Sequence, residues 1–340
     1  MALSNEETLQ RLTAMVRAKT GDSGARVHSM ETLPGHAGFS YSFVVEHSDA
    51  SRPNRNLVIR ISPPDVKISG PADVVRQAKI MASFAGTAVP VPPILWWGDE
   101  AEFFGRPYFV AGFVDGFKLG EVVLPPADIS RLANKAVATL AILHSQDWES
   151  RRSAFGDPIT LEDEMKRLDY LLDRPTLDPA VVARGPLLRE RLRSTLPANP
   201  RLGCVHGDFQ WSNILFNNDG PMALIDWEIS SIGPVMLDLG WLCFFADPRS
   251  FVEHSTAEVA RFMPLAPDEI VATYTASASF PVDAQDVRWF RAFSAYRFGV
   301  ITCFNVMLHR RGKRHDPHWE DIAISAPRMF ESGLELLGVA

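Results

Sequence analysis

Three side chains in the stretch Cys204–Trp241 have types and spacing that could do chemistry together. Asp208 is followed five positions later by Asn213, and Asp226 follows Asn213 by thirteen positions. Carboxylate and amide oxygens are ligands that suit Mg²⁺, which also keeps several waters and takes oxygens from substrate phosphates. A second carboxylate that does not bind the metal can accept a proton from an attacking hydroxyl. The types and order of these residues therefore indicate phosphoryl transfer.

A hairpin is predicted directly after Asn213, and it would bring these groups together. Residues 214–216 form a short apolar run, residues 217–220 read Asn-Asn-Asp-Gly, and residues 223–225 form a returning strand that ends at Asp226. Asn213 and Asp226 would lie side by side at the open end of such a hairpin, with Asp208 in the loop before it. Two carboxylates and an amide would then converge on one small volume.

The elements around this stretch change in character along the chain. Strands predominate early, with apolar runs at 57–61 and 106–114 and a helix predicted over 72–85. From Asp128 onward the pattern is mostly helical, with one helix near 162–172 and a long one that starts near Asp283. A first helix is also predicted, from Ser4, which forms a capping box with Glu7, to Gly21.

The sequence thus predicts an α+β fold with two lobes that meet near residues 115–128. We assign residues 1–112 to a small β-rich N-terminal lobe that includes the first helix. Residues 113–340 form a larger helical C-terminal lobe that carries the Asp208 stretch. A length of 340 residues fits two domains or one bilobal unit.

Composition excludes several classes of protein. Hydrophobic residues make up 46% and charged residues 22%, which excludes a largely disordered chain. A net charge of −7 argues against nonspecific nucleic-acid binding. The longest apolar run, 299–308, is too short to span a membrane, so we expect neither nucleic-acid nor membrane partners. Three widely spaced cysteines without a Cys-x-x-Cys motif favour a reduced, cytoplasmic location. The oligomeric state is left open.

Three sequence blocks resemble the aminoglycoside phosphotransferase family of kinase-like enzymes. The blocks are His206-Gly207-Asp208 with Asn213, Ile225-Asp226-Trp227-Glu228, and Asp238-Leu239-Gly240-Trp241. The runs Val58-Ile59-Arg60 and Leu140–Ser145 are similar to those of kinase-like domains that are fused to acyl-CoA dehydrogenases. The resemblance is clear over about residues 33–241. It implies a bilobal protein-kinase-like fold and transfer of the γ-phosphoryl group of ATP, with Mg²⁺, to a hydroxyl of a small molecule.

The resemblance also implies roles for single residues. Asp208 would be the catalytic base, or the carboxylate that positions the hydroxyl, while Asn213 and Asp226 would bind Mg²⁺. His206 would brace the catalytic loop. Asp238 would hydrogen-bond the backbone of that loop.

Further residues would contact the nucleotide. Gly35 and Gly38 would lie in the turn that covers the phosphates, followed by Phe39-Ser40 where many relatives have Ser-Asn. Arg60 stands where the family has a strand lysine or arginine that touches the phosphates. The remaining expected contacts are Gln77 on the next helix and Gly112, Phe113 and Val114 in the hinge that binds adenine.

Two departures from the family pattern concern the nucleotide. The strand cation is Arg60, which stays charged and can bind a phosphate through two nitrogens. Gln77 stands where the family has a glutamate, so it could hydrogen-bond Arg60 but not pair with its charge. That change leaves a catalytically inactive, pseudokinase-type binding protein as an alternative to the enzyme, although the intact set of Asp208, Asn213 and Asp226 favours the enzyme.

The acceptor is the second open question. Aminoglycosides are polycations, and the acids between Asp157 and Asp173 could suit them. An aminoglycoside or macrolide antibiotic is therefore kept as the alternative acceptor. The basic run His309–His315 instead favours a neutral or anionic hydroxylated metabolite, such as a hydroxyacyl-CoA; the plainer interpretation of this run is favourable charge at a helix C-terminus. Glu228 is either a neighbour of the metal site or a solvated acid. His144 is interpreted as a packing histidine, and the cysteines beside the motif, Cys204 and Cys243, as small core residues.

Overall fold

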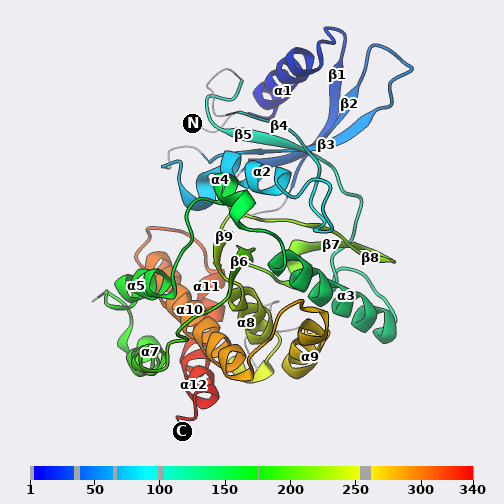
Figure 1. The fold of residues 1–340 in the computed structure, drawn as a ribbon. Coiled ribbons are helices and arrows are strands. Elements are labelled where there is room, and N and C mark those ends of the chain that lie inside the picture. The colour runs from blue at the N-terminus through cyan, green and yellow to red at the C-terminus, as the bar shows by residue number, and fades with distance from the viewer. Residues whose placement is uncertain are drawn as a thin grey trace. The chain divides into compact units, whose positions relative to one another are not determined.

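The computed structural model describes residues 4–33, 39–63, 67–98, 103–174, 176–252 and 262–339. Within these residues the chain divides into two compact units. The first contains residues 1–117 together with the short segments 153–155 and 222–229, and the second contains the remaining residues from 118 to the C-terminus. Figure 1 shows the strands β1 to β5 of the first unit and the helices of the second. A small sheet-based lobe and a larger helical lobe are the expected fold class, and this expectation is confirmed.

The first unit is built on a five-stranded antiparallel sheet in the order β1-β2-β3-β5-β4. Alternate residues of β3, which are Leu57, Ile59 and Ile61, are buried, whereas Arg60 between them faces the opposite side of the sheet. The strands are β1 (Arg26–Thr32), β2 (Phe39–Glu46), β3 (Arg55–Ile61), β4 (Ile94–Gly98) and β5 (Tyr108–Gly112). The strands predicted at 57–61 and 106–114 are thus present as β3 and β5.

Helix α1 (Asn5–Thr20) covers the buried side of this sheet. The Ser4 side chain accepts a hydrogen bond from the Glu7 amide, and the Glu7 carboxylate accepts one from the Ser4 amide, so the predicted capping box is present. Gly21 ends the helix with a φ of 68°, a left-handed conformation that glycine adopts without strain. Helix α2 (Val74–Ala82) lies inside the predicted range 72–85, and Asp73 caps its first turn.

The second unit is mostly helical. Its centre is α10 (Ala284–Arg310), which packs against α8 (Met236–Phe245) and α12 (Ala326–Leu336). Asp283 caps α10, and α5 (Leu161–Leu172) also contacts α10, which confirms both helices predicted there. The other helices are α3 (Pro126–His144), α6 (Pro179–Val182), α7 (Gly185–Ser194), α9 (Pro267–Ser277) and α11 (His318–Ala323), while the short α4 (Arg152–Phe155) lies where the chain enters the first unit.

Short strands position the candidate site in the second unit. β6 (Leu202–Val205) pairs in antiparallel fashion with β9 (Ser231–Pro234), which leads directly into α8. β7 (Ile214–Asn217) ends in the predicted turn, where Asn217 Oδ1 accepts hydrogen bonds from the amides of Asp219 and Gly220. The chain then continues as β8 (Gly220–Leu224).

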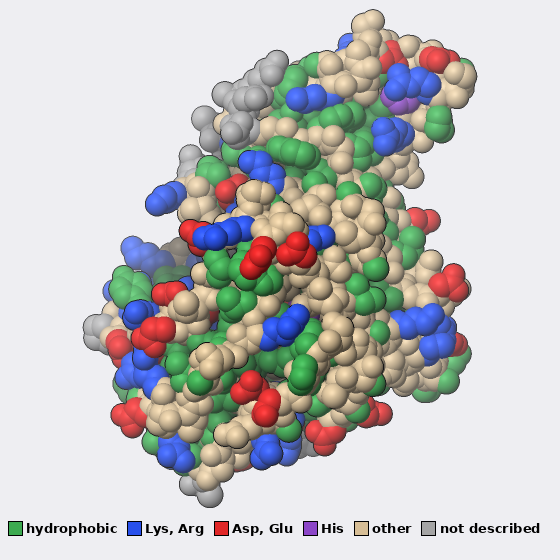
Figure 2. Space-filling view, in the orientation of Figure 1, with side chains coloured by type: hydrophobic (Ala, Val, Ile, Leu, Met, Phe, Trp, Pro, Cys, Tyr) green, Lys and Arg blue, Asp and Glu red, His purple; other side chains and the backbone are tan. Residues whose placement is uncertain are grey.

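On the face drawn in Figure 2, basic and acidic side chains are interspersed. Among the residues that the structure describes, no helix combines the length and the apolar character that crossing a membrane requires.

Candidate active site

The loop after β6 is held by one buried carboxylate. Asp238, in the first turn of α8, is fully buried and accepts hydrogen bonds from the amides of His206 and Gly207, both at 2.7 Å. Gly207 has a φ of 87°, a conformation that favours glycine, and this turn lets two successive amides face the same carboxylate. The β6–β9 pairing brings the loop and the start of α8 together, because β9 leads into α8. The loop backbone is therefore fixed where Asp208 follows.

A second buried chain of hydrogen bonds supports Asp238 from α3 and α9. His144 Nε2 lies 3.2 Å from Asp238 Oδ2, and His144 Nδ1 lies 2.6 Å from the Tyr274 hydroxyl. A carboxylate only accepts, so His144 donates through Nε2–H and accepts the Tyr274 O–H at Nδ1. Burial raises the pKa of Tyr274, which keeps this donor protonated. His144 thus has the packing role expected from the sequence, with the added function of orienting Asp238.

The Asp208 carboxylate is held by three donors. Oδ1 accepts from Gln210 Nε2 at 2.9 Å and from the Trp241 indole Nε1 at 2.8 Å, while Oδ2 accepts from Asn213 Nδ2 at 2.8 Å. The Asp208 amide donates to His206 Nδ1 at 3.3 Å. Each carboxylate oxygen can accept about two hydrogen bonds, so Oδ2 keeps a position for a further donor. A hydroxyl group is a donor of this kind.

Asn213 contacts Asp208 through its side-chain nitrogen. Its side-chain nitrogen donates to both the carbonyl and the carboxylate of Asp208, which fixes the orientation of the amide. The amide oxygen makes no hydrogen bond with any residue in the described ranges. The structure therefore brings Asp208 and Asn213 together and leaves an oxygen of the type that suits Mg²⁺.

Asp226 belongs to the first unit, where it pairs with Arg60. Arg60 Nη1 donates to Asp226 Oδ1 at 3.0 Å, and Arg60 Nη2 donates to Glu228 Oε2 at 2.9 Å. Asp226 has a φ of 67°, a left-handed conformation that is uncommon for residues other than glycine but that aspartate adopts more readily than most. Trp227 between the two acids is fully buried against Phe84. The charge pairing that Gln77 does not supply thus comes from Asp226 and Glu228.

Ser40 and Gln77 are two further residues of the first unit that were predicted to contact the nucleotide. Ser40 lies directly opposite Arg60 in the β2–β3 register, so these two are neighbours. Gln77 is buried in α2, and its contact with Arg60 stays a prediction. Gly35 and Gly38 lie outside the described residues.

The predicted hinge follows β5, and two of its three amides donate hydrogen bonds to backbone carbonyls. The Gly112 amide donates to the Pro93 carbonyl at 2.8 Å, and the Phe113 amide donates to the Asn56 carbonyl at 2.9 Å. A Cβ at Gly112 would lie 2.8 Å from Pro93 Cγ, so this close contact requires glycine. Of the three hinge residues, Val114 alone has an amide without a hydrogen-bond acceptor among the described residues. The contacts of Gly112, Phe113 and Val114 with adenine stay a prediction, in which Val114 could still donate through its amide.

Sequence reasoning missed two contacts of the site. Trp241 stands in a family-like block without a direct role assigned to it from the sequence, yet its indole donates directly to the candidate base. Glu228 was left open, and it binds Arg60. A tryptophan three residues after Asp238 lies on the same side of α8 as that aspartate, so helical spacing was a usable signal for Trp241.

The cysteines take no part in the site. Cys204, Cys243 and Cys303 are free and buried, and burial raises the pKa of each thiol to about 12. They are small core residues, as expected for Cys204 and Cys243.

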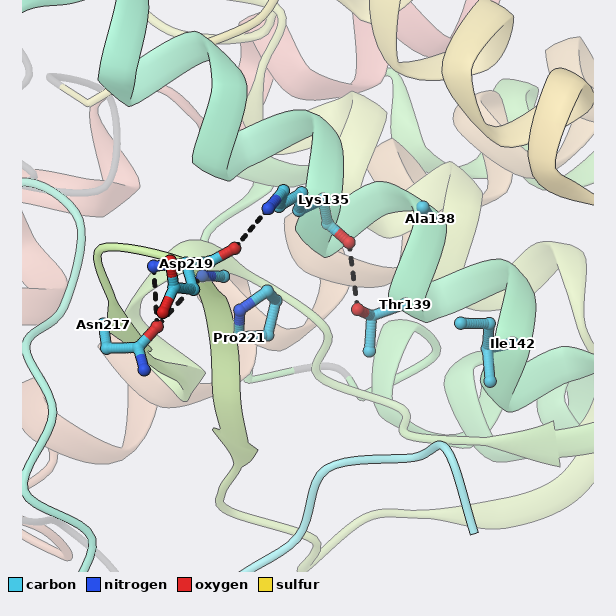
Figure 3. Close-up of a pocket in the computed structure, with 8 residues that line it drawn as sticks. Lys135, Ala138, Thr139, Ile142, Asn217, Asp219 and Pro221 are labelled. Carbon is cyan, nitrogen blue, oxygen red and sulfur yellow. Dashed lines mark hydrogen bonds between the residues drawn. The ribbon is translucent and has the colours of Figure 1, made fainter.

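One pocket of the second unit lies apart from the predicted site residues. It measures about 390 Å³ and is formed by α3 and the turn after β7. Figure 3 shows Lys135 donating to the Asp219 carbonyl across this hollow, and Thr139 bonding within α3. None of Asp208, Asn213 and Asp238 lines it.

The chain is similar to curated proteins that are much longer. It is 27% identical over 210 residues to the mouse protein acyl-CoA dehydrogenase family member 10, a match that covers 58% of this chain and 19% of that protein. It is 26% identical over 296 residues to the probable acyl-CoA dehydrogenase IBR3 of Arabidopsis thaliana, covering 78% of this chain and 35% of that protein. The chain thus matches only a fifth to about a third of these relatives' length.

Solved structures share the fold. A candidate aminoglycoside phosphotransferase from Ralstonia eutropha has a TM-score of 0.75 at 20% identity, with 97% of this chain and 98% of that chain covered. A thermostable mutant of the aminoglycoside phosphotransferase APH(4)-Ia, solved with AMP-PNP and hygromycin B, has a TM-score of 0.62 at 15% identity, with 95% and 98% covered.

A family model covers most of the site. The model of the phosphotransferase enzyme family, APH, matches residues 32–266, which include β2 to β9 and α8. With Asp208, Asn213, Asp226 and Asp238 inside that match, the chain belongs to the phosphotransferase enzyme family.

Proposed function

We propose that this protein is a small-molecule kinase that uses ATP and Mg²⁺ and transfers the γ-phosphoryl group to a hydroxyl of its acceptor. Membership of the family supports a kinase-type phosphotransferase, and the structure in complex with AMP-PNP among the fold neighbours supports ATP as donor. A cytoplasmic location accords with three free thiols in a chain without disulfides.

The observation that carries the proposal is the arrangement around Asp208. Gln210 and Trp241 hold Oδ1, Asn213 holds one side of Oδ2, and Asp238 fixes the backbone before it. A carboxylate that only maintained a turn would not need an indole donor from a helix 33 residues away in sequence. The arrangement suits a base that must stand ready in one orientation.

The acceptor hydroxyl donates its hydrogen bond to Asp208 Oδ2 and loses that proton to Asp208 as its oxygen forms a bond to the γ-phosphorus of ATP. The bond between this phosphorus and the β–γ bridging oxygen breaks, and ADP leaves. Bound Mg²⁺ would supply neutralisation of the phosphate charge, and Asn213 and Asp226 are the residues proposed to hold it. Arg60, oriented by Asp226 and Glu228, would bind the phosphates through its guanidinium group.

The acids of α5 argue against a polycationic antibiotic as the acceptor. Glu162 and Asp169 both pair with Arg193, and Glu164 pairs with Arg167. Asp157 and Asp173 pair in the same way with Arg152 and Arg189. An aminoglycoside would have to compete with these arginines for each of these five carboxylates. We therefore keep the hydroxylated metabolite, a hydroxyacyl-CoA included, as the proposed acceptor class.

The basic run His309–His315 supports an anionic acceptor less strongly than its sequence suggests. Arg310 pairs with Glu320 and Asp178, and Arg314 donates to Asn305 Oδ1. Much of this charge therefore ties the end of α10 to its surroundings. This matches the plainer interpretation of the run, a helix C-terminus with favourable basic charge.

The test is acceptor-dependent release of ADP by the wild type, Asp208→Asn and the control Asp219→Asn. Asp219 is an exposed aspartate of the turn after β7, so its replacement should leave the rate unchanged. Across a library of amino alcohols, aminoglycosides, macrolides and hydroxyacyl-CoAs, we expect turnover with the last class. We expect Asp208→Asn to lower kcat by about 10²- to 10⁴-fold, the usual contribution of a positioned base.

A binding measurement separates an enzyme from a pseudokinase. If no acceptor supports ADP release, the thermal shift with ATP and Mg²⁺ is compared with the shift for ATP and EDTA. Absence of a Mg²⁺-dependent shift, together with absence of turnover, would contradict the kinase proposal.

A further inference from the structure

Arg297 is a buried cation that the proposed reaction does not yet use. It lies on α10, and only 7% of the residue is exposed. No hydrogen bond or ion pair joins its side chain to any residue in the described ranges, and its Nε is buried without a partner. A buried charge without a compensating partner is costly, so a chain that keeps one without a use is unusual.

The position of Arg297 connects it to the candidate base. Its guanidinium carbon lies 4.6 Å from the centre of the Trp241 ring, and the Nε1 of that ring donates to Asp208 Oδ1 at 2.8 Å. One indole side chain therefore contacts both the cation and the base. All three residues belong to the second unit.

The charges around Arg297 compensate it only in part. Glu164, Asp208 and Asp238 favour its charged form, Arg167 disfavours it, and burial outweighs these effects and lowers its pKa. An arginine keeps its charge at neutral pH nevertheless. Phe298 and the aromatic cluster around Trp241 exclude water nearby, which would strengthen any ion pair that forms there.

We propose that Arg297 binds an anionic group of the acceptor, a carboxylate or a phosphate, and so places the acceptor hydroxyl at Asp208. The guanidinium group offers paired N–H donors that match either anion. This proposal rests on the proposed function and narrows its acceptor to hydroxylated anions. The negative charge must lie close to the hydroxyl, since only Trp241 separates Arg297 from the base. Among the proposed metabolites this favours a free hydroxy acid or a phosphate ester over a hydroxyacyl-CoA, whose phosphates are far from the acyl hydroxyl.

The experiment measures anion binding without nucleotide, so that it does not depend on turnover. The variants are Arg297→Met and Arg297→Lys, with Arg174→Met as the matched control. Arg174 also has a buried Nε without a partner and lies over aromatic rings, but those of Tyr170 and Phe304. The probes are a hydroxydecanoate against its methyl ester, and glycerol phosphate against glycerol, which distinguishes a carboxylate from a phosphate.

We expect one of the two anions to raise the Tm of the wild type while its neutral counterpart does not. Arg297→Met should raise the Kd for that anion by about tenfold or more, and Arg297→Lys should raise it less. Arg174→Met should bind the anion as tightly as the wild type does. An equal shift in Arg297→Met and wild type overturns the proposal. Absence of a shift by either anion in the wild type also overturns it.

Two further readouts separate this proposal from a structural role and from the proposed function. With an anionic acceptor that turns over, Arg297→Met should raise the acceptor KM and leave the KM for ATP unchanged. If Arg297→Met lowered kcat/KM equally for anionic and neutral acceptors, Arg297 would act only through Trp241, and this would contradict the proposal. Anion binding without any ADP release would instead overturn the kinase function and leave the Arg297 site standing.

Discussion

Asp238 shows how much one side chain contributes to this site. Its two carboxylate oxygens accept the His206 and Gly207 amides, and His144 approaches the same group from α3. Every donor in this set is buried, so none has water as an alternative partner. The carboxylate thus stabilises the fold and orients the catalytic loop at once.

Replacing Asp238 by Asn should be costly for both reasons. The new NH₂ group would face a backbone amide or His144 Nε2, so at least one buried donor would lose its acceptor. We expect the free energy of unfolding to fall by about 3 kcal/mol in a urea titration monitored by circular dichroism. Asp268→Asn is the control, because Asp268 is 98% exposed and its replacement should change stability by less than about 0.5 kcal/mol. Equal stability of the two variants would contradict the role given to Asp238.

Contacts between single residues were predictable where the two residues lie close together in the sequence. Asp208 and Asn213 lie five residues apart on a short loop, so their contact could be expected from the sequence. The Arg60–Glu228 pair joins residues 168 positions apart, and no local sequence pattern predicts this contact. The same holds for Arg297, whose sequence context reads as an ordinary buried helix face.

At the scale of elements, the contact of α8 with α10 fixes the helix that carries both Asp238 and Trp241. Gly240 makes this contact possible, since a Cβ there would lie 2.5 Å from the Phe290 carbonyl oxygen of α10. A backbone carbonyl inside a helix cannot move aside as a side chain can. The two helices therefore approach as closely as glycine allows.

We expect Gly240→Ala to lower the free energy of unfolding by about 3 kcal/mol, because the added methyl forces α8 away from α10. Displacement of α8 should also weaken the Trp241–Asp208 bond and reduce activity. Gly185→Ala is the comparison, because a Cβ there meets Leu172 Cδ1 at 3.1 Å, a flexible side-chain atom. Thermal unfolding of both variants measures the difference, and a smaller loss in Gly240→Ala than in Gly185→Ala would contradict this account.

Elements with local signals were predicted well. The capping box and Gly21 delimit α1, and apolar runs locate β3, β5 and α10. The β6–β9 pairing was not predicted, because each strand has four residues and their partners lie about thirty positions apart. Pairing of such short strands depends on tertiary packing more than on β-propensity.

At the scale of the whole molecule, the division of the chain into two units matters for the chemistry. Asp208 and Asn213 belong to the helical unit, whereas Asp226, Glu228 and Arg60 belong to the sheet unit. The residues named in the proposed reaction are thus divided between the two units. The curated relatives are longer than the match by several-fold, so their additional parts lie outside what this chain can explain.

The three buried cysteines all lie in the helical unit, and this predicts the reactivity of the molecule as a whole. With thiol pKa values of about 12, roughly one thiol in ten thousand is ionised at pH 8, and none of the three is accessible. We expect the native protein to react negligibly with Ellman's reagent, and the protein in denaturant to yield three equivalents per chain. Fast reaction of a native thiol would contradict the burial described for these residues.

Because the native thiols should not react in the folded protein, the chain is suited to site-specific labelling at an introduced cysteine. A single cysteine introduced at an exposed position of the sheet unit, such as Ile68, which is 43% exposed, would be the one fast-reacting thiol on the folded molecule. A fluorophore or spin label attached there would follow movements of the sheet unit during a catalytic cycle, without first stripping any cysteine from the natural sequence.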